Sequence, residues 1–65
     1  MHKPLNTDII KKYLDDNGLS IKEFCRQCKI STSSFYRIMQ DKNFRIISLF
    51  KIAKKLNIPI HKFFE

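Results

Sequence analysis

Cys25 and Cys28 are the side chains in this sequence whose types and spacing first suggest chemistry. A Cys-x-x-Cys pair can supply half of a zinc site or act as a thiol–disulfide couple. A structural zinc needs about four ligands, and a reactive pair normally opens a helix, where the helix dipole lowers the thiol pKa. This pair instead falls in the second half of a predicted helix. We therefore expect a packing role for both cysteines, and neither a metal site nor a redox switch.

The other residues capable of catalysis lack suitable companions. His2 and His61 stand alone in the sequence, with no companion at ligand spacing. Asp15 and Asp16 are adjacent, so they point to different faces of a helix. The sequence contains no Ser-His-acid order and no glycine-rich phosphate loop. We expect no enzymatic activity, no cofactor and no small-molecule ligand.

The chain is strongly basic, and its charge is unevenly distributed. Its 13 lysines and arginines outnumber its 6 acidic residues, which gives a net charge of +7. Residues 1–19 are balanced, so the whole excess lies in residues 20–65. A basic block in a small domain suggests a polyanionic partner, and nucleic acid is favoured over a membrane.

Length and composition predict one globular domain over residues 1–65. Hydrophobic residues make up 43% of the chain, with six Phe, which excludes the disordered class. No apolar run approaches the roughly 20 residues of a membrane span, and the first residues lack the apolar stretch of a signal peptide. We expect a cytoplasmic protein in which residues 1–6 form a flexible N-terminal arm.

Apolar periodicity predicts an all-α fold, a compact bundle of about five short helices. Ser20 and Glu23 have the spacing of a capping box at the start of one helix. Gly18 and Asn57 are suited to end helices, and Pro59 suits the first turn of a new one. The expected helices cover residues 7–17, 20–28, 32–40, 45–56 and 58–65.

Residues 20–40 combine into a helix-turn-helix geometry. Two helices joined by so short a connection must cross steeply, so the residue at the crossing has to be small, and it is Cys25. Ile30 fills the turn, while Phe35 and Ile38 hold the following helix to the core. The residues left on the outer face of that helix are Thr32, Ser33, Tyr36, Arg37 and Gln40.

On these residues the chain resembles the helix-turn-helix domains of phage Cro and lambda-type repressors, also called XRE-type regulators. "LSIKEFCRQCKISTSSFYRIMQDKN" follows the pattern of that family, and "LFKIAKKLNIPIHKFF" is similar to its last two helices. The resemblance covers residues 7–64. Two departures stand out: Lys29 occupies the turn position where the family usually has Gly, and Ile21 stands where Gln is common.

The resemblance implies that the helix over about Thr32–Gln40 lies in the major groove of double-stranded DNA. Arg37 is the residue suited to a bidentate contact with guanine. The implied base contacts are Thr32, Ser33, Tyr36, Arg37 and Gln40. The implied phosphate contacts are Ser20, Lys22, Ser31, Lys42, Asn43 and Arg45, although Ser31 is favoured as the cap of the helix rather than as a base reader. We expect Lys29 to be neutral to binding, and Lys51, Lys54 and Lys55 to form an ordinary solvated face.

The function that follows is sequence-specific DNA binding by a transcriptional regulator, most simply a repressor of a prokaryotic cell, phage or mobile element. Such modules bind pseudo-palindromic operators as dimers, because one short helix reads too few bases. Phe63 and Phe64 are the candidates for the homodimer contact, and the equal alternative for Phe64 is partial burial in the core of the single chain. The alternative is a protein-interaction module, such as an antitoxin or anti-repressor with the same fold.

Overall fold

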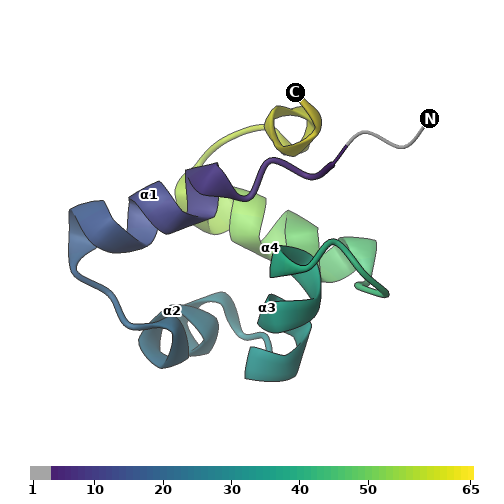
Figure 1. The fold of residues 1–65 in the computed structure, drawn as a ribbon. Helices are drawn as coiled ribbons and strands as arrows, with labels where there is room; N and C mark the ends of the chain where they lie inside the picture. Colours follow the sequence, from purple (N-terminus) through teal and green to yellow (C-terminus); the bar gives the residue numbers. More distant parts are fainter. Residues whose placement is uncertain (1–3) are drawn as a thin grey trace.

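The computed structural model describes residues 4–65, which form four α-helices followed by a 3₁₀ helix (Figure 1). This architecture confirms the all-α prediction. The last expected helix is present, but it is a short 3₁₀ helix rather than an α-helix. The elements are α1 (Asp8–Asn17), α2 (Ile21–Cys28), α3 (Thr32–Met39), α4 (Ile46–Leu56) and η1 (Ile60–Phe64).

The helix ends follow the local signals of the sequence closely. Gly18 and Asn57 end α1 and α4 in the left-handed conformation, with φ of 60° and 59°. α3 ends one residue earlier than expected, because Gln40 is its C-cap and lies outside the helix. α4 begins one residue later than expected, because the backbone of Arg45 is extended (ψ 137°) and this residue is the N-cap.

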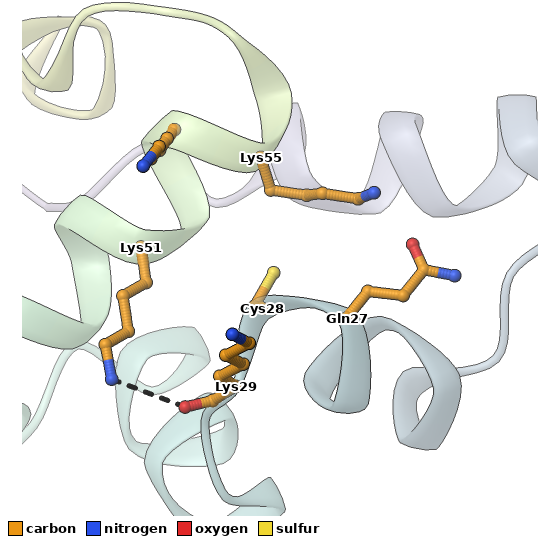
Figure 2. Close-up of a pocket in the computed structure, with 6 residues that line it drawn as sticks. Gln27, Cys28, Lys29, Lys51 and Lys55 are labelled. Carbon is orange, nitrogen blue, oxygen red and sulfur yellow. Dashed lines mark hydrogen bonds between the residues drawn. The ribbon is translucent and has the colours of Figure 1, made fainter.

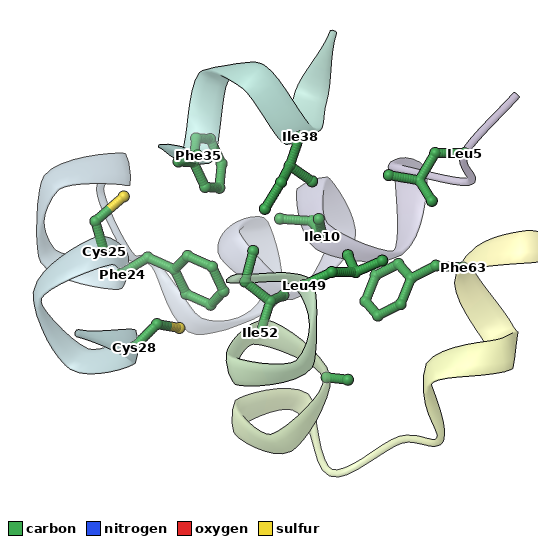
Figure 3. Packing of buried hydrophobic residues seen from close by; sticks show 11 residues of the cluster. Leu5, Ile10, Phe24, Cys25, Cys28, Phe35, Ile38, Leu49, Ile52 and Phe63 are labelled. Carbon is green, nitrogen blue, oxygen red and sulfur yellow. The ribbon is translucent and has the colours of Figure 1, made fainter. Parts of the chain in front are cut away.

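The helices enclose one apolar core (Figure 3). Phe24 and Phe35 meet edge to face near its centre, with ring centroids 5.9 Å apart. Aromatic pairs in this geometry contribute about 0.5–1.5 kcal/mol beyond the burial of their area. The largest fully buried side chains are Phe24, Phe35, Phe63, Ile10, Ile38, Leu49 and Ile52.

Residues 4–6 are fixed to this core, which corrects the expectation of a flexible arm for that part of the chain. The side chain of Leu5 is buried in the apolar cluster. The Leu5 amide donates to Asp41 Oδ2 at 3.2 Å, and the Asn6 amide donates to the Phe63 carbonyl at 2.7 Å. The segment before α1 is thereby joined both to η1 and to the turn that follows α3. Residues 1–3 of the expected arm lie outside the described part.

Within residues 4–65, no helix combines the length and the apolar character needed to cross a membrane.

Candidate nucleic-acid interface

The turn between α2 and α3 has the geometry that the sequence predicted for it. Lys29 is the C-cap of α2 and has a positive φ of 61°. Its amide donates to the Arg26 carbonyl at 3.2 Å, and the next amide, of Ile30, donates to the Cys25 carbonyl at 3.1 Å. A side chain at a left-handed position costs about 1 kcal/mol relative to Gly. The turn therefore forms with Lys, under mild strain.

The start of α2 is capped, although only half of the predicted capping box is present. Ser20 Oγ accepts a hydrogen bond from the Glu23 amide at 3.1 Å. The Glu23 carboxylate turns to the helix surface, where it accepts from both Arg26 and Gln27. These hydrogen bonds, that of Arg26 above all, lower the pKa of Glu23 to about 2. The carboxylate therefore belongs to a surface ion pair rather than to the cap.

The start of α3 is capped by its own serines. Ser31 Oγ accepts from the Ser34 amide at 3.0 Å and donates to Ser34 Oγ at 2.9 Å. These bonds satisfy an amide that the helix leaves without an intrahelical acceptor. The first role of Ser31 is therefore structural, and it fixes where α3 begins.

The two cysteines are buried packing residues. Cys25 and Cys28 are 2% and 6% exposed, and both are free thiols. Burial raises the pKa of Cys25, and burial followed by the neighbouring Cys25 raises the pKa of Cys28 to about 11. Both thiols are therefore protonated at neutral pH, which is the opposite of what nucleophilic or metal-binding cysteines require. Cys25 lies on the buried face of α2, in agreement with the small packing residue expected there.

The described residues offer no assembled metal site. Within residues 4–65, no group of three or more His, Cys, Asp or Glu side chains converges. His61 Nε2 lies 3.7 Å from a Glu65 carboxylate oxygen on the exposed surface. His2, the other histidine considered from the sequence, lies outside the described residues.

The outward face of α3 carries all the residues expected to read bases. Phe35 and Ile38 bury the opposite face of the same helix. Tyr36 is 49% exposed, and its ring also meets Phe35 edge to face at 5.8 Å. This contact holds the ring against the helix without burying it. The exposed residues on this face and at its end are Thr32, Ser33, Tyr36, Arg37 and Gln40.

The residues expected to contact phosphates fall into two groups. One group lies at helix starts, where the hydroxyls of Ser20 and Ser31 are occupied as caps and Lys22 is exposed. The other group lies on the connection between α3 and α4, where Lys42, Asn43 and Arg45 are exposed. Asp41 and Asn43 both have a positive φ, so the backbone turns sharply within this connection.

A hollow between α3 and α4 brings a candidate base contact and candidate phosphate contacts together. It has a volume of about 370 Å³ and is mostly polar. Arg37 from the base-reading face and Arg45 from the connection both line it. Lys29 and Lys51 line it as well, and the sequence reasoning had left both outside the site. The proximity of residue 29 to residue 51 depends on how α2 packs on α4, which local patterns do not give.

The predicted dimer contact is corrected for one of its two residues. Phe63 is fully buried in the core of the single chain, so its side chain is not available to a partner. Phe64 is 45% exposed and remains a candidate. Sequence reasoning missed a second set of exposed apolar side chains, which lies on the first half of α4: Ile46, Ile47 and Phe50.

Comparison with known proteins agrees with this geometry. A family model for the Cro/C1-type helix-turn-helix DNA-binding domain matches residues 10–65. No curated protein and no solved structure matches the chain. The matched range includes α2, the turn, α3 and α4, and with them all the exposed residues described above. The chain belongs to the Cro/C1-type helix-turn-helix DNA-binding domains.

Proposed function

We propose that this protein is a sequence-specific transcriptional regulator that represses transcription by binding double-stranded DNA through the outward face of α3. The observation that carries the proposal is the two-sided character of α3. Phe35 and Ile38 anchor one face in the core, and the other face presents polar and basic side chains to solvent. A short helix held in this way can enter the major groove without disturbing the fold.

Each base-contact candidate has a chemical role. Arg37 has the planar guanidinium that pairs bidentately with O6 and N7 of guanine, and Gln40 has the amide that pairs with adenine. Thr32 offers a methyl group to thymine or a hydroxyl to other bases. Ser33 and Tyr36 contribute hydroxyl groups at the centre of the exposed face. We expect Arg37 to contribute most to discrimination between sequences.

The proposed phosphate contacts lie on both sides of α3. Lys42, Asn43 and Arg45 would hold the backbone at its C-terminal side. Ser20 and Ser31 cap the starts of α2 and α3, where the remaining uncapped backbone amides could receive a phosphate, and Lys22 would add a charge at the start of α2. These contacts fix the orientation of α3 and carry no sequence information of their own.

A homodimer on a pseudo-palindromic operator completes the proposal. One copy of α3 covers few base pairs, and two copies related by a two-fold axis double the readout. Phe64 is the proposed contact, because it is exposed at the C-terminal end of η1. The protein would act in the cytoplasm, associated with the nucleoid when bound, and by binding rather than by catalysis.

Selection of bound duplexes from a random pool, followed by titration of the selected site over a salt series, tests this function. We expect an inverted repeat to emerge, two protein copies per duplex, and affinity that falls steeply with salt. A reporter gene placed behind the selected site should be expressed less when the protein is present. Absence of binding to any duplex at low salt would sink the proposal.

A protein-interaction role is the second candidate, and one observation favours it. Ile46, Ile47 and Phe50 expose about half of their surfaces, at 52%, 55% and 49%. Apolar side chains gathered on an exposed face often mark a contact with another protein. If the random pool yields no site, a search for a partner protein whose binding is abolished by Phe50→Ser becomes the decisive experiment.

A further inference from the structure

Four lysines surround a hollow between the end of α2 and the second half of α4 (Figure 2). Its volume is about 420 Å³, and its lining contains no carboxylate. Cys28 lies at the α2 side with its protonated thiol, so the charge of the hollow comes from ammonium groups alone. The lining residues are Gln27, Cys28, Lys29, Lys51, Lys54 and Lys55.

This lysine hollow continues into the hollow beside α3. Lys29 and Lys51 line both hollows, and Arg37 and Arg45 line the one beside α3. Together these residues form a band of cations that extends from Arg37 on α3 along α4. We call this set the basic band: Arg37, Arg45, Lys29, Lys51, Lys54 and Lys55.

The charges of the basic band are not neutralised within the described chain. The ion pairs of residues 4–65 involve other cations, such as Lys12 with Asp16 and Arg26 with Glu23. Within the band, Lys51 Nζ donates to the Lys29 carbonyl at 3.4 Å, which positions the ammonium without cancelling its charge (Figure 2). Lys51 and Lys55 are four residues apart on one helix, where like charges are mutually unfavourable. An anion in the hollow would relieve this repulsion.

We propose that the basic band is a track for the DNA phosphate backbone that extends the footprint of the protein beyond α3, with Lys54 and Lys55 at its far end. This inference rests on the proposed function. A duplex fits the band better than a small anion does, because the cations form an open row along two consecutive hollows rather than a closed pocket. Flexible lysines are suited to a row of phosphates, since each acts as a point charge without demanding one geometry.

The salt dependence of DNA binding tests the track. The double variant Lys54→Gln/Lys55→Gln should reduce the slope of log K against log salt by about 1.8, since each lost phosphate contact removes about 0.9. It should leave the ratio of affinities for selected and random DNA unchanged, because phosphate contacts carry no sequence information. The matched control is Lys11→Gln/Lys12→Gln. It removes the same charge from two exposed positions on α1 and should leave the slope as in the wild type.

The outcomes separate the track from the proposed function. If the wild type binds no duplex, the proposed function fails. If it binds and the two double variants have equal slopes, the track is wrong and the DNA-binding function stands. Inorganic phosphate that perturbs the NMR signals of Lys54 and Lys55 while their substitution leaves the DNA slope unchanged would identify a small-anion site and overturn the track. Circular dichroism confirms folding, and Lys55→Gln alone, with an expected change of about 0.9, replaces the double variant if that variant does not fold.

Discussion

Leu5 and Asp41 are joined across the fold, because the backbone amide of Leu5 donates a hydrogen bond to Asp41 Oδ2 at 3.2 Å. This bond ties the segment before α1 to the turn that follows the proposed recognition helix. Asp41 has a φ of 55°, a conformation that Asp tolerates better than most residues. The N-terminal segment is therefore a strap that helps to set the path of the chain from α3 to the exposed Lys42 and Asn43.

The strap should contribute measurably to stability. Leu5→Ala removes a side chain that is 8% exposed, so we expect the free energy of unfolding to fall by about 2 kcal/mol, at the lower end for buried leucines because the site lies at the core edge. Ile46→Ala is the control, because Ile46 is 52% exposed and its truncation should change stability by less than about 0.5 kcal/mol. Urea unfolding measures both variants, and equal losses of stability would show that the N-terminal strap does not stabilise the fold.

Strain at the turn between α2 and α3 should be removable. Lys29→Gly places at φ 61° the residue that adopts this conformation without a steric cost, so the free energy of unfolding should rise by up to about 1 kcal/mol. Lys29→Ala is the control, because it removes the same charge and keeps the Cβ. Thermal unfolding that ranks Lys29→Gly at or below Lys29→Ala would contradict the assignment of strain.

Substitution of Ser31 should lower the stability of the protein, whereas substitution of Ser33 should not. Ser31→Ala removes the oxygen that caps the Ser34 amide, so it should lower the free energy of unfolding by about 1 kcal/mol. Ser33→Ala removes an exposed hydroxyl on the proposed base-reading face and should leave stability within about 0.5 kcal/mol. Chemical unfolding of both variants checks the difference, and a larger loss for Ser33→Ala would invert the two roles.

The thiols should be inert in the folded protein. Burial raises the pKa of Cys28 to about 11, so its thiolate fraction falls as the pH is lowered and is below about one in a thousand at pH 7.5. Reaction with a disulfide reagent at this pH should be at least about 100-fold slower than in denaturant. DNA binding should be unchanged by chelator or reductant. Rapid native labelling, or binding lost on reduction, would restore a redox role to the pair.

Local signals in the sequence were sufficient to predict the helices and the turn. Ser20, Ser31 and Asn57 act at helix ends through hydrogen bonds or backbone conformations that depend on residues close in the chain, so their roles were readable. The small residue at the helix crossing, Cys25, followed from the shortness of the turn. The type of the last helix was not predicted, because a single turn after Pro59 satisfies either α or 3₁₀ geometry.

The features that were not predicted depend on contacts between distant segments. Leu5 looks like part of a polar terminus, and only its packing beside Phe63 and Asp41 makes it a core residue. Phe63 and Phe64 are adjacent and chemically identical, so sequence alone did not determine that the first is buried and the second exposed. The proximity of Lys29 to Lys51 likewise required the packing of α2 on α4. Local patterns predicted α3 and its exposed face, whereas the extent of the basic surface around it needed the fold.

The proposed base-reading role of Arg37 is tested most directly by the ratio of affinities for the selected duplex and for random DNA, measured for the wild type, Arg37→Ala and Lys42→Ala. A bidentate contact to guanine contributes about 1–3 kcal/mol of discrimination, so Arg37→Ala should reduce this ratio by about 5- to 150-fold. Lys42→Ala should weaken binding to both duplexes alike and keep the ratio. A ratio that is unchanged by Arg37→Ala, in a protein that still folds and binds, would contradict base reading by the outward face of α3 at this residue.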